Sequence, residues 1–172
     1  MQVVGKFSKV SYDEFAKAIR SEVDAITEDA IIDIYNTIKL PKRATTGSAG
    51  YDFFSPIWFE LHPGESIKVP TGVNVDIADG WFLGCVPRSG LGFKYRAQLD
   101  NTIGVIDSDY IFSDNEGHIW AKITNDSKSD KVLTVNKGDA FMQGIFIQYG
   151  VTTDDKTTGI RNGGFGSTGG AQ

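Results

Sequence analysis

The sequence predicts a mainly β protein, a sandwich or barrel of the jelly-roll kind, with one helical segment near its N-terminus. Two observations support this prediction. From residue 40 onward the chain consists of short apolar or alternating runs, separated by turns such as His62-Pro63-Gly64. Before residue 40 the apolar residues recur at spacings of three and four. The first pattern is typical of all-β sandwiches and barrels, and the second of helices.

Residues 3–10 are predicted to form a strand, and a helix is predicted to begin after Ser11. Ser11 and Glu14 have the spacing of a capping box, in which hydroxyl and carboxylate satisfy free backbone donors at a helix start. Thr27 can cap a second helix. The apolar stripes of the two helices comprise Phe15, Ala18, Ile19, Val23, Ile26, Ile31, Ile34, Tyr35 and Ile38. We expect these stripes to pack on the protein's own core, and a docking surface for a partner is the alternative.

The β part is predicted from runs without a visible internal repeat, so all 172 residues are expected to form one domain. The runs cover residues 52–60, 66–76, 81–86, 103–111, 118–125, 131–135 and 140–148. Residues 159–170 differ, because six of these twelve are Gly. Composition alone indicates a disordered end here. A mobile arm that wraps a phosphate is the alternative, since the tail also carries Arg161, Phe165, Ser167 and Thr168.

Charge and cysteine content exclude several classes. The net charge of -5 argues against the broad basic surface of a nucleic-acid-binding protein. The single cysteine, Cys85, excludes an internal disulfide, and its apolar run indicates a buried, inert thiol. No run approaches about 20 apolar residues, and residues 1–10 lack the apolar core of a signal peptide. We therefore expect a cytoplasmic protein with no membrane contact.

Four segments mix glycine with charged or polar side chains. Pro87-Arg88-Ser89-Gly90-Leu91-Gly92 offers a guanidinium, a hydroxyl and flexible backbone N–H groups, which suit a polyphosphate, although an ordinary turn is the alternative. Asp107 and Asp109 end an apolar strand and share a side if it stays extended; solvated turn acids are the alternative. Ala49-Gly50-Tyr51-Asp52 and the lone amide of Gln143 are weaker signals.

Taken in order, five segments resemble the motifs of the trimeric dUTP pyrophosphatase (dUTPase) family. They are residues 49–52, 87–91, 104–110, 138–143 and 161–169. Each alone is unspecific, but five in order are specific, and the resemblance covers about residues 38–170 and the first strand. It implies a β-clip type jelly-roll homotrimer with active sites shared between subunits. It also implies a flexible Gly-rich C-terminal arm, residues 159–172, that closes the site. Residues 11–38 have no counterpart in the minimal family fold.

The resemblance implies hydrolysis of dUTP to dUMP and pyrophosphate with Mg²⁺, which limits uracil in DNA and supplies dUMP for dTMP synthesis. It assigns Asp107 as the general base for the attacking water and Asp52 as an outer-shell partner of the metal. The implied phosphate-binding residues are Arg88, Ser89, Gly90, Gln143, Arg161, Ser167 and Thr168. The implied uracil- and deoxyribose-binding residues are Asn101, Gly104, Ile106, Tyr110 and Phe165, with the ring of Phe165 stacked on uracil.

The sequence departs from the family pattern in two places. Ala140 stands where the family usually has a basic residue. Residues 111–116 lengthen a hairpin, and Asn115-Glu116-Gly117-His118 resembles a variant in Gram-positive bacteria and their phages. We expect His118 to contact only solvent, and a position facing the site is the alternative.

Two other functions are alternatives for this sequence. The related dCTP deaminases need a catalytic Glu on the strand after the third motif, but residues 119–124 carry no carboxylate. A binding or regulatory module that contacts a protein partner through residues 11–38 is the remaining alternative.

Overall fold

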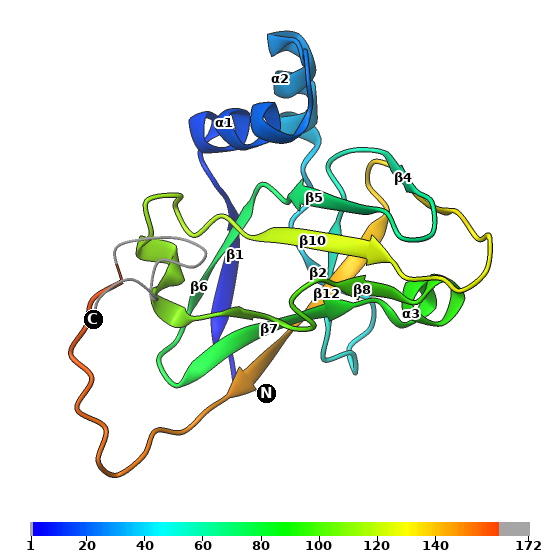
Figure 1. The fold of residues 1–172 in the computed structure, drawn as a ribbon. Coiled ribbons are helices and arrows are strands. Elements are labelled where there is room, and N and C mark those ends of the chain that lie inside the picture. Colours follow the sequence, from blue (N-terminus) through cyan, green and yellow to red (C-terminus); the bar gives the residue numbers. More distant parts are fainter. Residues whose placement is uncertain (1, 162–172) are drawn as a thin grey trace, which may run out of the picture.

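The structure is a computed structural model that describes residues 2–161 (Figure 1). Its strands are β1 (Gly5–Lys9), β2 (Lys42–Arg43), β3 (Tyr51–Phe54), β4 (Phe59–Leu61), β5 (Ser66–Pro70), β6 (Val73–Ile77), β7 (Trp81–Pro87), β8 (Ala97–Leu99), β9 (Gly104–Ile106), β10 (Trp120–Asn125), β11 (Leu133–Val135) and β12 (Ala140–Gln148). Its helices are α1 (Tyr12–Glu22), α2 (Glu28–Thr37), α3 (Ser89–Tyr95) and the 3₁₀ helix η1 (Ser108–Phe112). The mainly β prediction is confirmed.

Two sheets form the body of the domain. One has the strand order β2-β3-β12-β7-β9, and the other has the order β5-β10-β8. Smaller antiparallel pairs, β1 with β6 and β4 with β11, extend the structure. Phe53, Leu83 and Met142 of the first sheet share one buried cluster with Val69 and Ile123 of the second. The two sheets therefore share a common core, as in a sandwich.

The helical segment packs on this core. α1 and α2 lie together beyond β5 in Figure 1. Phe15, Ile19 and Ile31 are fully buried and Ile38 is buried, while Val23, Ile26, Ile34 and Tyr35 are partly buried against the same core, so the stripes pack on their own domain as expected. The docking alternative therefore loses the apolar surface on which it depended.

The capping prediction is half right. The Ser11 hydroxyl accepts a hydrogen bond from the Glu14 backbone N–H at 3.2 Å, and the Thr27 hydroxyl caps α2 in the same way. The reciprocal bond from Glu14 does not form. The backbone N–H of Ser11 donates to Glu116 Oε2 at 2.7 Å instead, because the carboxylate of Glu14 is turned toward His118.

Other strand predictions need correction. The run 52–60 is divided between β3 and β4, and the run 103–111 ends as a strand at Ile106. η1 follows, so Asp107 and Asp109 do not lie on an extended strand. Residues 88–92, expected to be a flexible polyphosphate-binding segment or an ordinary turn, form the start of α3 with Arg88 as its N-cap residue. In the described part of the chain no helix is long and apolar enough to span a membrane.

Candidate active site

Three of the five motifs meet on neighbouring strands. β3 and β7 both pair with β12, and their registers place Asp52 and Val86 opposite Gln143. A cavity of about 390 Å³ opens at this point, and we call it the Arg88 pocket. It is lined by Ala44, Ser48, Ala49, Gly50, Asp52, Arg88, Ser89, Gln143 and Ile145. The structure thus gathers the candidates from the first, second and fourth motifs, with Gly90 next in the first turn of α3.

An ion pair with Asp52 holds the guanidinium of Arg88 in this pocket. Arg88 Nε lies 3.0 Å from Asp52 Oδ1, and Arg88 Nη1 donates to the carbonyl of Ala140 at 3.4 Å. The side chain of Arg88 is 43% exposed, whereas that of Asp52 is 19% exposed. The carboxylate and the carbonyl therefore orient a guanidinium that still faces solvent. Ala140 contributes its backbone to the pocket although it lacks the basic side chain usual in the family.

Gly50 makes room for the amide of Gln143. A Cβ on Gly50 would lie 2.3 Å from Gln143 Oε1 and 3.2 Å from its carboxamide carbon. The Gln143 Nε2 group donates to the carbonyl of Pro87 at 3.5 Å, so this half-buried side chain spans from β12 to β7. Gly50 and Gln143, which were two separate weak signals in the sequence, are therefore in contact with each other in the structure.

The second cavity lies against the segment that joins β8 to β9; the two strands belong to different sheets, so the predicted hairpin shape is loose here. The cavity has a volume of about 240 Å³, and we call it the hairpin pocket. Its lining residues are Lys68, Cys85, Leu99, Asp100, Asn101, Gly104, Ile106, Trp120, Ala121 and Lys122. Gly104 allows β9 to lie close to Cys85 and Asn101, because a Cβ on Gly104 would lie 3.2 Å from Cys85 Cβ and 3.7 Å from Asn101 Nδ2. The structure therefore brings Asn101, Gly104 and Ile106 together, as predicted.

Cys85 is a buried thiol, as expected. It is 3% exposed, and burial raises its pKa to about 12. A thiol with such a pKa is protonated at neutral pH and is a poor nucleophile. Cys85 therefore contributes to the hairpin pocket as part of its wall and not as a reactive group.

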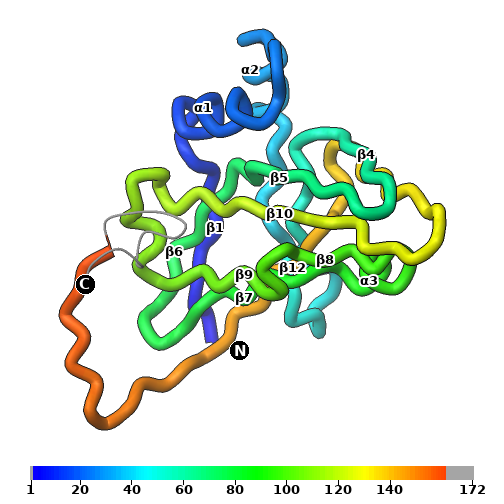
Figure 2. Tube along the Cα trace, viewed as in Figure 1, coloured from blue at the N-terminus to red at the C-terminus, as the bar shows by residue number. Residues whose placement is uncertain are grey.

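Two carboxylates stand beside the hairpin and share one cation. Asp107 is the N-cap residue of η1, and Asp109 is in its first turn. Arg161 Nη2 donates to Asp107 Oδ2 at 2.5 Å, and Arg161 Nε donates to Asp109 Oδ1 at 2.8 Å. The guanidinium also lies 5.6 Å from the centre of the Tyr110 ring. Figure 2 shows residues 149–161 looping away from β12 and returning to this segment.

The loop behind η1 fixes the phenol of Tyr110. Tyr110 is 4% exposed, and burial raises its pKa. Its hydroxyl donates to the carbonyl of His118 at 3.0 Å and accepts from Asn115 Nδ2 at 2.9 Å. The expectation that His118 contacts only solvent is wrong, because its side chain is fully buried between Glu14 and the backbone of Gly72.

The described candidates thus form three groups in one chain: the two pockets, and the cluster of Asp107, Asp109 and Tyr110 around Arg161. Among the described residues, none lines both the Arg88 pocket and the hairpin pocket. Phe165, Ser167 and Thr168 lie outside the described residues, together with most of the predicted arm. Lys68, Trp120 and Lys122 of the hairpin pocket were not predicted. Period-two alternation along 120–122 could have placed the last two on one face.

Comparisons with known proteins show a similarity over most of the chain. The family model described as dUTPase matches residues 36–169. A deoxyuridine 5'-triphosphate nucleotidohydrolase of Actinobacillus succinogenes is 38% identical over 138 residues, which cover 76% of this chain and 87% of that protein. The protein of the same name from Lactococcus lactis is 38% identical over 135 residues, covering 77% and 89%.

Solved structures give the same fold. A dUTPase from Streptococcus mutans superposes with a TM-score of 0.59 at 32% identity, covering 76% of this chain and 95% of that one. A variant dUTPase from phage phi11 of S. aureus, described with a structural Mg(II) ion, gives a TM-score of 0.57 at 23% identity. It covers 70% of this chain and 90% of its own, and at this identity it supports the fold alone.

Proposed function

The chain belongs to the dUTPase family, and from this premise we propose that it hydrolyses dUTP to dUMP and pyrophosphate with Asp107 as the general base. The observation that carries the proposal is the combination of the hairpin pocket, adjacent carboxylates and a separate cationic pocket. A nucleotide needs these three: a shaped cavity for its base, a base for the attacking water and cations for its phosphates. The product dUMP would feed dTMP synthesis, and removal of dUTP would limit uracil in DNA.

In the proposed reaction, a carboxylate oxygen of Asp107 accepts a proton from the water whose oxygen attacks the α-phosphorus. The bond from that phosphorus to the bridging oxygen of the β-phosphate breaks, and pyrophosphate leaves. Asp107 is suited to this task because its side chain is 48% exposed and reachable by water. Arg88, Ser89, Gly90 and Gln143 bind the phosphate chain, where the planar guanidinium matches phosphate oxygens.

Arg161 has two possible partners in this scheme. In the free chain its guanidinium neutralises Asp107 and Asp109, and its side chain is only 16% exposed. The proposed role on the terminal phosphate requires it to exchange these carboxylates for phosphate oxygens. That exchange would release Asp107 to the water when substrate is present. Phe165, Ser167 and Thr168 are proposed to follow as the arm closes and excludes water.

Base and sugar are proposed to bind at the hairpin. Asn101 offers an exposed amide, and the backbone around Gly104 and Ile106 lies beside the cavity, so the uracil edge can be matched by hydrogen bonds. Tyr110, which is buried here, is proposed to pack against the deoxyribose and exclude a 2'-hydroxyl once Arg161, whose guanidinium lies 5.6 Å from the ring centre, moves to the phosphates. A pocket built for one base edge rejects analogues by leaving polar groups unpaired.

The residues fit Mg²⁺ only as outer partners. Within residues 2–161 no group of three or more His, Cys, Asp or Glu side chains could hold a metal ion. Direct ligands would therefore come from phosphate oxygens and water, which is usual for Mg²⁺ at phosphate sites. Asp52 would accept hydrogen bonds from such waters. When bound, the cation neutralises charge on the phosphates.

We also propose a homotrimer with shared sites, as the family resemblance implies. The absence of a common lining residue between the two pockets over residues 2–161 is consistent with substrate bridging two copies. The structure gives no support to the deaminase alternative, because β10 carries no carboxylate. Pyrophosphate release should be measured for each dNTP with and without Mg²⁺. We expect release with dUTP and Mg²⁺; ammonia release from dCTP, or equal turnover of all dNTPs, would overturn the proposal.

A further inference from the structure

The helical segment, residues 11–38, is hydrogen-bonded to the loop that follows η1. The Ser11 backbone N–H and hydroxyl donate to the two carboxylate oxygens of Glu116 at 2.7 and 2.6 Å. Glu14 Oε1 lies 3.0 Å from His118 Nδ1. We call Ser11, Glu14, Glu116 and His118 the clasp. It joins residues more than 100 positions apart in sequence, so it is a tertiary contact that local helix formation does not require.

The geometry fixes the proton on the His118 ring. The backbone N–H of Gly72 donates to Nε2 at 2.9 Å, so Nε2 carries a lone pair. Nδ1 therefore carries the hydrogen and donates it to Glu14. A second proton on Nε2 would face the Gly72 N–H donor, and burial lowers the pKa of His118 to about 4. The ring is thus neutral and held from both sides.

The clasp continues to the phenol. The carbonyl of His118 accepts the hydrogen bond from the Tyr110 hydroxyl, and Asn115 Nδ2 donates to the same hydroxyl. Gly117 has a φ of +67°, and a Cβ there would lie 2.6 Å from Ile111 Cα, so the loop is folded tightly on η1. The backbone N–H of Tyr110 donates to the carbonyl of Asp107 at 3.1 Å.

We propose that residues 11–38 act as a positioning element for the sugar site, in which Glu14 works through His118 to set the ring of Tyr110. The inference rests on the proposed packing of Tyr110 against deoxyribose and adds the segment that controls it. A purely structural fastening would stabilise the domain without any effect on sugar choice. The positioning role predicts that loosening the clasp admits ribose more readily.

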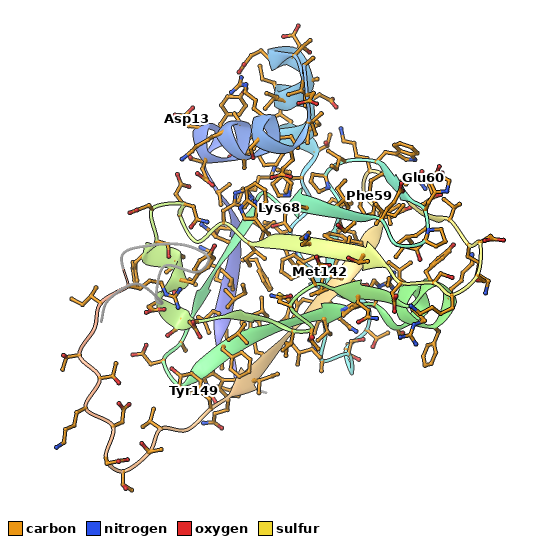
Figure 3. The ribbon with its side chains drawn as sticks, viewed as in Figure 1. Asp13, Phe59, Glu60, Lys68, Met142 and Tyr149 are labelled. Atoms are coloured by element: carbon orange, nitrogen blue, oxygen red, sulfur yellow. The ribbon has the colours of Figure 1, made fainter. Side chains whose placement is uncertain are left out.

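The test compares dUTP with UTP as substrates of the full chain. The Glu14→Ala variant removes the acceptor for the His118 Nδ1–H group. We expect its ratio of kcat/KM for dUTP over UTP to fall about threefold to tenfold, the worth of one buried hydrogen bond. Glu14→Gln retains an acceptor oxygen and should keep the ratio. Asp13→Ala, at an exposed carboxylate on the same turn (Figure 3), is the matched control.

A loss of folded protein lowers both activities equally and leaves the ratio unchanged, so the ratio separates positioning from stability. If Glu14→Ala does not fold, Glu14→Asp replaces it, because the shorter side chain pulls on His118 while keeping its charge. An unchanged ratio in Glu14→Ala, or in Glu14→Asp where it replaces it, while Tyr110→Ala lowers the ratio, overturns the inference alone. An unchanged ratio in Tyr110→Ala overturns the sugar role of Tyr110 and the inference with it.

Discussion

Acidification should destabilise this protein through one buried histidine. His118 is fully buried and neutral, and burial lowers its pKa from 6.5 to about 4. In the unfolded chain the same group binds a proton below pH 6.5, which the folded chain does not. Its contribution to stability is therefore fully present above pH 6.5 and is lost as the pH falls toward 4.

The magnitude follows from the two pKa values. Each pKa unit of difference is worth about 1.4 kcal/mol, so the whole loss is about 3 kcal/mol. At pH 5 the linkage relation gives a loss of about 2 kcal/mol. Burial raises the pKa of Glu14, so protonation of this carboxyl has the opposite sign. Because Glu14 remains in a His118 variant, its own contribution largely cancels in the comparison with wild type.

The assay is urea unfolding followed by the fluorescence of the three tryptophans, at pH 7.5, 6.5 and 5 and fixed protein concentration. Wild type should lose about 2 kcal/mol more between pH 7.5 and 5 than His118→Asn. His62→Asn changes the other histidine, which is exposed, and should behave as wild type. Parallel losses in wild type and His118→Asn would refute the reasoning.

Two further substitutions test the pockets. Gly50→Ala should lower kcat/KM for dUTP about tenfold while the fold is retained, because the new Cβ displaces the end of Gln143. Gly47→Ala, where a Cβ meets nothing within 4 Å, is its control, and equal activity of the two variants would contradict a role for Gln143. Arg161→Ala should raise KM for dUTP about tenfold through loss of a charge-assisted phosphate contact. Lys156→Ala, exposed on the same arm, should not, and equal KM values would remove Arg161 from phosphate binding.

The sequence predicted the features that depend on neighbouring residues in the chain. The start of α1 follows from Ser11 and the apolar spacing, and the burial of Phe15 follows from its place in the stripe. The partner of Glu14 lies 104 residues away, so no local rule could identify it. A buried histidine with two fixed partners looks the same in sequence as a loop histidine in solvent.

The same reasoning explains the errors around the active site. α3 contains two glycines in seven residues and no apolar stripe, so it resembled a turn. η1 follows directly after an apolar run, so the sequence pattern predicted that the strand continues through it. Asp107 and Asp109 nevertheless lie near each other, because both carboxylates accept hydrogen bonds from Arg161. Gly50, Arg88 and Gln143 were nevertheless predicted, because five unspecific segments in order resemble the family's motifs; their contacts across the pocket could not be read from the sequence.

The central claim is that Asp107 activates the water that attacks dUTP. The direct measurement is pyrophosphate release by Asp107→Asn, paired with calorimetric titration of dUTP into the same variant and with Asp130→Asn as an exposed control. Asp107→Asn should still bind dUTP while its turnover falls about 10²-fold or more, and Asp130→Asn should be unaffected. Turnover near the wild-type rate in Asp107→Asn would contradict this claim.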